Sequence, residues 1–278
     1  IKIPELRQRI LFTLGIIALC RFTANIPCPG VDPDKLELLF QSMQEKSGGG
    51  GLLGMFDMFT GGALQRFAVG TLGIMPYITA SIIMQLLIPV IPAMEKLSRE
   101  GDVGRQKINQ YTRYVTLLIC VVHGTAATKL MLSPSILGGA QVTIVNNPGP
   151  LFNVSSVIFL TAGTMLLVWL GEQITERGIG NGVSLIITVN ILSRLPFAIT
   201  GLVKLAYGGG AGGNVVQVLI LIVMFFVICA GTVALTQGQR KVPIRHAKRM
   251  VGRHMTSGQT SYLPLRVNFS GVMPIIFG

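Results

Sequence analysis

The stretch "GMFDMFTGGALQRF" at residues 54–67 is too apolar for water and too short to cross a lipid bilayer. It holds two Met and three Phe, while Asp57 and Arg66 lie on either side of the pair Gly61-Gly62. A membrane-spanning helix needs roughly 20 apolar residues. Backbone that stops short at membrane depth is tolerated only where protein or trapped water covers it. The stretch therefore predicts a re-entrant element that folds back into a protein-lined cavity.

The composition around this stretch is that of a membrane protein. Of the 278 residues, 50% are hydrophobic and only 12% are charged, and the mean hydropathy is +0.62. An average soluble domain has roughly 25% charged residues. Six apolar windows have the ~17–25 residues that a membrane helix needs. We expect spans at residues 10–26, 67–91, 114–132, 154–170, 183–203 and 215–235.

A seventh apolar run begins at Val267 and reaches the last residue, Gly278, before it could cross a bilayer. We therefore expect the chain to be a piece of a longer protein, with residues 267–278 as the start of a seventh span. No cleavable signal peptide follows Ile1, so the first span itself would direct insertion. The expected fold class is all-α, a multi-pass transmembrane helical bundle.

Lys and Arg residues predict the orientation, because cytoplasmic loops are enriched in them. Most of the 23 lie before the first span, between the second and third, and after the sixth, so the N-terminus is predicted to be cytoplasmic. Three cations, Arg21, Lys129 and Arg194, fall inside apolar windows. Arg21 and Lys129 lie near the outer ends, and all three are expected to snorkel to the interface, which long side chains can reach. Since Arg194 precedes Pro196, an outer vestibule is its expected place.

Catalytic chemistry has little support in this sequence. All eleven Asp and Glu residues lie outside the apolar windows, whereas proton-coupled carriers need carboxylates at membrane depth. The four cysteines fit neither a zinc site nor a redox pair and are expected to be buried thiols. "GIGNG" at residues 178–182 lacks the preceding strand of a phosphate loop and is expected to be a tight turn. We expect no enzyme activity, cofactor or metal.

The loop at residues 236–266 is unusually basic. It contains seven Lys or Arg, adds His246 and His254, and has no acid. Its simplest interpretation is a topology signal with some attraction for anionic lipids. However, "RKVPIRH" and "SYLPLRVNF" alternate like two short strands that project basic side chains into the cytosol. This pattern favours docking to a large anionic partner through salt-dependent contacts.

Seven motifs, in this order, closely resemble the SecY family, whose members are the central channel subunits of bacterial protein translocases. The resemblance covers essentially all 278 residues. The motifs are "IPCPGVD" (26–32), "FTGGAL" (59–64), "GIMPYITASIIMQLL" (73–87), "REGDVGRQKINQYTRY" (99–114), "ERGIGNGVS" (176–184), "HAKR" (246–249) and "YLPLRVNFSGVMP" (262–274).

The resemblance implies an inverted-repeat channel, of which the chain holds the N-terminal half and the start of the second half. Residues 52–67 are then the plug, a short half-helix that fills the outer funnel of an hourglass pore and moves when a polypeptide passes. The window from Gly70 would be the rest of the same broken span. The candidate plug residues are Leu52, Met55, Phe56, Asp57, Met58, Phe59, Thr60, Gly61 and Gly62.

The resemblance also implies an aliphatic pore ring, which blocks ions because a narrow apolar constriction dewets. By helical spacing alone, its i, i+4 pairs could equally serve core or lipid packing. A lateral gate, through which signal sequences leave into lipid, is expected between the second and seventh spans, with Thr79, Gln85 and Asn268 as candidate contacts. The ring residues are Ile74, Ile78, Ile187, Ile191 and Ile276, with a sixth expected beyond Gly278.

The partners implied by the resemblance are the SecE and SecG subunits, the SecA ATPase, the ribosome through its RNA, signal sequences and nascent chains. Anionic lipids are a further expected partner of the basic loops. The implied location is the cell inner or plasma membrane. The expected docking residues for the ribosome or SecA are Arg105, Lys107, Arg240, Lys241, Arg245, Lys248, Arg249 and Arg253.

The functional prediction is a protein-conducting channel subunit that moves unfolded secretory polypeptides across the membrane and releases membrane segments sideways. A ribosome or an ATPase partner would supply the energy. The alternative is a small-solute secondary transporter, which also uses broken helices and inverted repeats. The lack of intramembrane carboxylates argues against a proton-coupled transporter. An intramembrane enzyme, the third class, would need a paired nucleophile and base that the sequence does not show.

Overall fold

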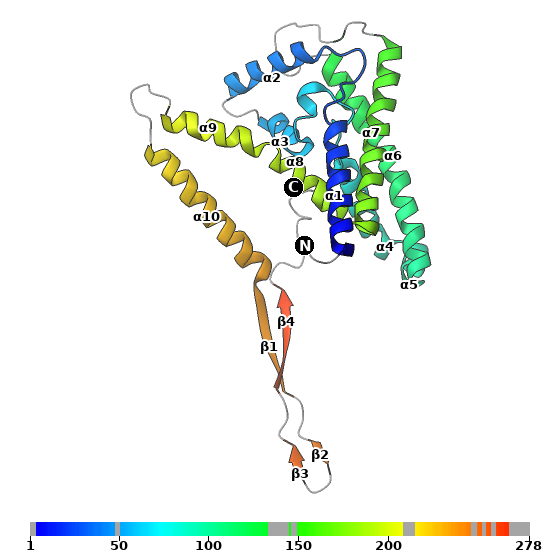
Figure 1. Ribbon diagram of the computed structural model, residues 1–278. Coiled ribbons are helices and arrows are strands. Elements are labelled where there is room, and N and C mark those ends of the chain that lie inside the picture. The colour runs from blue at the N-terminus through cyan, green and yellow to red at the C-terminus, as the bar shows by residue number, and fades with distance from the viewer. Residues whose placement is uncertain are drawn as a thin grey trace. The chain divides into compact units, whose positions relative to one another are not determined.

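The computed structural model describes most of the 278 residues, and these are mainly helical, as expected (Figure 1). They form two compact units, Ile1–Ala198 and Ile199–Gly278. The expected start of the seventh span lies outside the described residues, as do Lys248, Arg253, Asn268 and Ile276. The described residues are 4–47, 51–132, 145, 149–207, 215–245, 249–251, 254–256 and 260–266.

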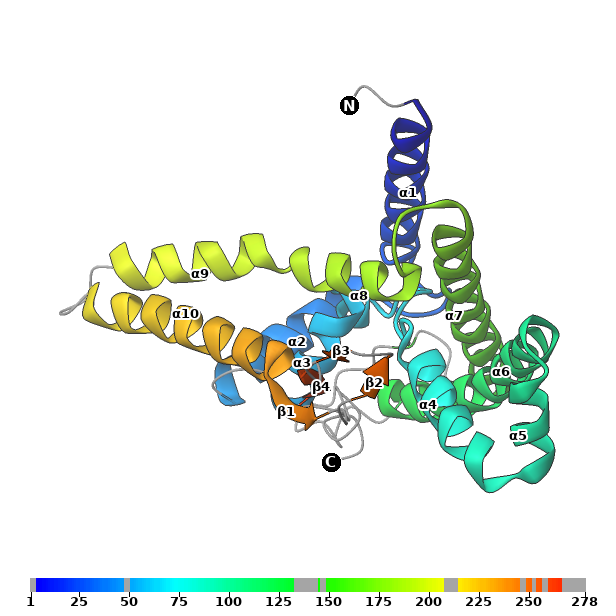
Figure 2. The ribbon, with the colours of Figure 1, turned by 90° about the horizontal axis from the view of Figure 1, so that it is seen from below.

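The first unit is a helical bundle. Helix α6 contacts both α4 and α7, and α7 also contacts α1 and α8 (Figure 2). A last helix, α9, crosses the unit boundary. The elements are α1 (Pro4–Thr23), α2 (Pro33–Ser47), α3 (Gly51–Thr60), the 3-10 turn η1 (Leu64–Arg66), α4 (Met75–Val90), α5 (Pro92–Arg99), α6 (Asp102–Leu132), α7 (Pro150–Arg177), α8 (Gly182–Leu192) and α9 (Leu195–Tyr207).

Several of these helices are long and apolar enough to cross a membrane. Among the described residues they are Asp102–Leu132, Pro150–Arg177, Gly182–Val203 and Val218–Gln237, and the pair α4 and α5 adds a fifth candidate that bends by 100°. Helix α1, on the first expected span, carries charged residues in its first and last turns and is not among them. The chain is therefore a multi-pass helical membrane protein.

The second expected span differs from its apolar window at the N-terminal end. The window begins at residue 67, but α4 begins only at Met75. Phe67 adopts a left-handed φ of 44° and Gly73 a φ of 57°, which a right-handed helix cannot contain. The intervening turns are apolar because they are buried in protein: Phe67 and Ala68 are both fully buried.

Two apolar cores hold the first unit together. One joins α2, η1 and Phe67 to the ends of α6 and α7, with Leu36 and Leu160 fully buried. The other joins α1, the start of α4, α7 and α8, and includes Ile174 and Ile186. Between α7 and α8, the "GIGNG" segment forms the expected tight turn, in which the Asn181 side chain accepts a hydrogen bond from the Ser184 backbone N–H. This turn lets α8 fold back onto α7.

The second unit contains α10 (Val215–Gln237) and a long β-hairpin. Strand β1 (Gln239–Arg245) pairs antiparallel with β4 (Thr260–Arg266), and β2 (Arg249–Val251) pairs with β3 (His254–Thr256). The two strands predicted in the basic loop are thus confirmed. Within β1, Arg240 lies opposite Leu265 and Lys241 opposite Pro264, so these two cations point to opposite faces of the ribbon.

Candidate functional site

Helix α3, the segment expected to be the plug, packs on α8 and η1. It buries polar side chains there and exposes apolar ones. Asp57 and Thr60 are each only 4% exposed. The large apolar side chains of Phe56, Met58 and Phe59 are instead 50%, 49% and 38% exposed. Among the side chains that the structure describes, α3 therefore contacts the protein through polar groups and leaves Phe56, Met58 and Phe59 partly exposed.

An ion pair joins α3 to the end of α8. The Arg194 guanidinium, which follows α8, pairs with the Asp57 carboxylate, and their side chains are only 20% and 5% exposed. The other Asp57 oxygen accepts a hydrogen bond from the Gln65 backbone N–H at 3.4 Å. Burial raises the pKa of the Asp57 carboxyl, and the Arg194 guanidinium opposes that shift. The charged form of Asp57 thus depends on Arg194.

The end of α3 is held by side chains that reach its carbonyl groups. The Arg21 guanidinium, near the end of α1, donates to the Gly61 carbonyl at 3.4 Å and also to the Val189 carbonyl of α8. The Asn190 side chain donates to the Phe59 carbonyl at 3.1 Å. Carbonyls in the last turn of a helix lack partners within it and carry its partial negative charge, which favours nearby cations.

The turn after α3 requires glycine twice. Gly61 and Gly62 have φ values of 68° and 93°, in the left-handed region that favours glycine. A Cβ on Gly61 would lie 2.6 Å from a terminal nitrogen of Arg21, and one on Gly62 would lie 2.7 Å from a terminal nitrogen of Arg194. The absence of a side chain at Gly61 therefore leaves room for the Arg21 guanidinium, and its absence at Gly62 leaves room for that of Arg194.

We call Arg21, Asp57, Asn190 and Arg194, together with the Gly61-Gly62 turn, the polar seat. Both Arg21 and Arg194 have partners within the protein, which the sequence did not predict. The sequence contained one signal for this pairing. The predicted orientation places Asp57 and Arg194, which have opposite charges, on the same side of the membrane. Charged residues are few in this chain.

The predicted pore-ring residues lie in different environments. Ile74 is buried in the core that also contains Ile186 of α8, and Ile78 packs against the same core while only partly buried. Ile187 is partly buried and Ile191 is 39% exposed. The structure thus brings the α4 pair close to α8, and the ring itself stays a prediction.

The other predicted contact residues are mostly exposed. In α4, Thr79 donates to the Met75 carbonyl of its own helix, and Gln85 is exposed. The predicted docking residues in the described part of the chain lie on α6 and on the hairpin. Arg105, Lys107, Arg240 and Lys241 are exposed, whereas the side chains of Arg245 and Arg249, like those of Leu52 and Met55 in α3, lie outside the described part.

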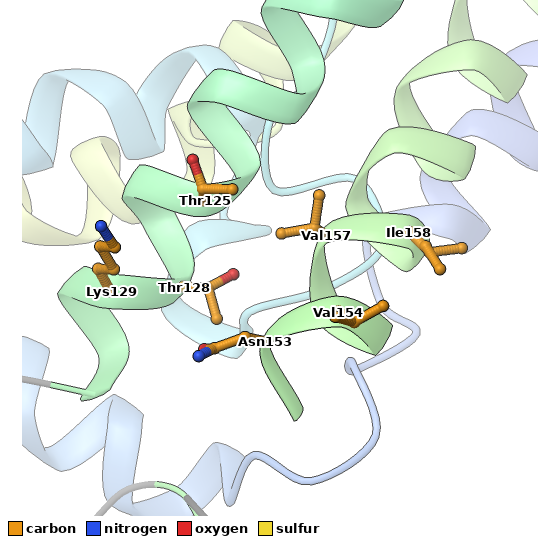
Figure 3. Close-up of a pocket in the computed structure, with 7 residues that line it drawn as sticks. All are labelled: Thr125, Thr128, Lys129, Asn153, Val154, Val157 and Ile158. Atoms are coloured by element: carbon orange, nitrogen blue, oxygen red, sulfur yellow. The ribbon is translucent and has the colours of Figure 1, made fainter. Parts of the chain in front are cut away.

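A groove of about 270 Å³ lies between α6 and α7 (Figure 3). The Asn153 Oδ1 atom is buried without a hydrogen-bond partner among the described residues. Within the same residues, no cluster of His, Cys, Asp and Glu could hold a metal. The groove therefore offers a mostly apolar surface rather than a reaction centre. Its lining residues are Thr125, Thr128 and Lys129 from α6, and Asn153, Val154, Val157 and Ile158 from α7.

Comparisons with known proteins point to one family. The family model described as SecY matches residues 68–278. The chain is 42% identical over 278 residues to "Protein translocase subunit SecY" of Streptomyces galbus, which covers 99% of this chain and 62% of that protein. The chain thus spans less than two thirds of the length of this relative.

Two solved structures share the fold. One, described as "The structure of a protein conducting channel", has a TM-score of 0.57 at 16% identity and covers 99% of this chain and 56% of its own. The other has a TM-score of 0.51 at 18% identity, covers 92% and 53%, and is described as showing that the SecY plug domain stabilises the closed state of its channel. At these identities the likenesses concern the fold alone.

Proposed function

The chain belongs to the SecY family, and on that premise we propose that it serves in the central subunit of a protein-conducting channel of the cell inner membrane. Unfolded secretory polypeptides would pass across the membrane, and membrane segments would leave sideways into lipid. Helix α3 and the following turn, within residues 52–67, would form the plug. The channel has no catalytic step of its own, and the ribosome or the SecA ATPase supplies the energy.

The observation that carries this proposal is the inverted packing of α3. Helix α3 buries Asp57 and Thr60 against the protein, while Phe56 and Met58 are about half exposed. Hydrogen bonds to the protein can be exchanged for hydrogen bonds to water with a small net change in free energy. Apolar surface has no such substitute. A short helix held by polar groups is therefore suited to leave its seat and return.

The proposed pore ring comprises Ile74, Ile78, Ile187, Ile191 and Ile276. Support comes from the shared core of the α4 start and α8, where Ile74 and Ile186 are both buried and Ile78 packs beside them. An apolar ring would exclude water and ions while giving a sliding polypeptide no fixed hydrogen-bond partner. The lateral gate would include Thr79, Gln85 and Asn268, between the second and seventh spans.

The basic hairpin is proposed to dock the ribosome or SecA on the cytoplasmic side, with SecE and SecG as further subunits. Its exposed cations Arg240 and Lys241 lie on opposite faces of the β1–β4 ribbon, so a partner can contact it from either side. The ion pair between Arg113 and Glu172, with an N···O distance of 3.0 Å, supports the proposed orientation. Arg113 lies in α6 and Glu172 in α7, and the charge pattern assigns both residues to the cytoplasmic side.

The test uses the full-length protein with its partner subunits, in planar bilayers and in proteoliposomes. Deleting residues 52–67 should leave the complex assembled, raise ion conductance and admit polypeptides with defective signal sequences. Unchanged conductance would show that α3 closes no pore. A solute transporter would behave differently, because neither the parent nor the deletion would translocate a secretory polypeptide.

A further inference from the structure

The polar seat has an unequal number of charges. Two guanidinium groups, of Arg21 and Arg194, lie on either side of the same Gly61-Gly62 turn, each against one of the glycines. The described residues place a single carboxylate there, that of Asp57, and it belongs to α3 itself. The charges that stay with the bundle are thus both positive, and the only negative charge moves with the plug.

Resting on the proposed function, we propose that this cluster is a self-closing latch. When α3 leaves, it removes the Asp57 carboxylate and the Phe59 and Gly61 carbonyls together. Arg21 and Arg194 then face each other at the seat without a carboxylate between them. The mutual repulsion of the two guanidinium groups favours the return of α3, so the channel stays open only while a passing chain occupies it.

The two arginines have different parts in the latch. Arg194 makes the ion pair with Asp57, and removing one partner of a buried ion pair leaves an uncompensated charge. Removing both partners is much less costly, because no charge is left behind. Among the described residues, Arg21 bonds only to carbonyl groups, of Gly61 after α3 and of Val189 in α8. It therefore joins α1, the turn and α8 without neutralising any charge.

This arrangement predicts a specific pattern among variants. Asp57→Asn should release α3 most, because it leaves both guanidiniums and no carboxylate. Arg194→Gln should also release α3, since it leaves a buried carboxylate without its partner. The double variant Asp57→Asn/Arg194→Gln should lie closer to the parent than either single variant, which is the opposite of additive behaviour.

The experiment measures plug position directly in the full-length protein with its partner subunits. Thr60 is 4% exposed in the closed seat, so Thr60→Cys places a thiol that reacts only when α3 moves. The parent carries this change together with Cys229→Ser, because Cys229 is exposed, and any other accessible cysteine is also replaced. The rate of reaction with a membrane-impermeant maleimide is then compared among the variants in proteoliposomes.

We expect Asp57→Asn and Arg194→Gln to react about tenfold faster than the parent or more. Lys129→Gln, which removes one positive charge from an exposed position on α6, should react at the parental rate. Arg194→Lys keeps the charge but loses the planar guanidinium group. Its reaction rate should lie between those of the parent and Arg194→Gln. Co-purification with the partner subunits checks that every variant is assembled.

Equal rates in the parent and both single variants would overturn the latch, as would a double variant whose rate is the product of the single effects. The same preparations are assayed for translocation of a secretory polypeptide. A lost latch with intact translocation leaves the channel function in place. Failure of the parent to translocate would contradict the channel function, while the labelling rates would still report on the latch.

Discussion

Helices α3 and α7 have similarly apolar sequences but bury different kinds of side chain. Helix α7 buries Leu160, Leu167 and Ile174, all at most 4% exposed, in the cores that hold the first unit together. Helix α3 buries a carboxylate and a hydroxyl, and its described apolar side chains Phe56, Met58 and Phe59 are 38–50% exposed. The comparison teaches that apolar content does not decide whether a helix is permanent. What matters is which side chains it places against its neighbours.

The largest effect should come from truncating the apolar core. Leu167→Ala in α7 should lower the free energy of unfolding by about 2–5 kcal/mol, because it removes buried methyl groups and leaves a cavity. Met58→Ala in α3, where the side chain is 49% exposed, should change stability by less than about 1 kcal/mol. Thermal unfolding of the two purified variants makes this comparison, and equal losses would remove the distinction between the helices.

A smaller effect should come from filling the space beside the polar seat. Gly62→Ala adds a Cβ that would lie 2.7 Å from an Arg194 nitrogen, at a φ of 93°. Strain of this kind costs on the order of 1–3 kcal/mol, so α3 should open more often and ion leak should rise in planar bilayers. Gly180→Ala is the matched control, because its φ is 74° and a Cβ there meets nothing within 4 Å. If the leak rises equally in both variants, backbone strain in general causes it, and the contact of Gly62 with the polar seat does not.

The pore ring extends the comparison to α4 and α8. Replacing Ile78 and Ile191 with Asn should raise ion leak a few-fold, because a polar lining removes the dewetting barrier. Leu192→Asn serves as control, since Leu192 neighbours Ile191 and is 51% exposed. If the Ile78 and Ile191 variants leak no more than the control, these side chains do not line the pore.

The smallest effects are expected where charge is fully exposed, on the hairpin. Neutralising Arg240 and Lys241 should weaken ribosome binding by about 0.2–1 kcal/mol per charge. The slope of log affinity against log salt should also flatten by about one unit for each phosphate contact that is lost. If the variant binds the ribosome like the parent across a salt titration, the loop serves only as a topology signal. Correct insertion of the variant is checked first.

The local elements could be predicted from the sequence better than the contacts between them. Alternation in the basic loop predicted the strands that became β1 and β4, and the glycines of "GIGNG" predicted a turn. The start of α4 was missed because an apolar window reports hydrophobicity and not the left-handed backbone at Phe67. The pair of Asp57 and Arg194 spans 137 residues, and no periodicity reports a contact of that kind.

The Gly61-Gly62 turn also constrains how this chain can evolve. Each glycine hydrogen faces an arginine side chain from a different helix. A side chain at position 61 or 62 would be strained by the left-handed backbone whatever residue stands at position 21 or 194. Relatives that keep this turn should therefore keep glycine at both positions, even where an arginine has changed.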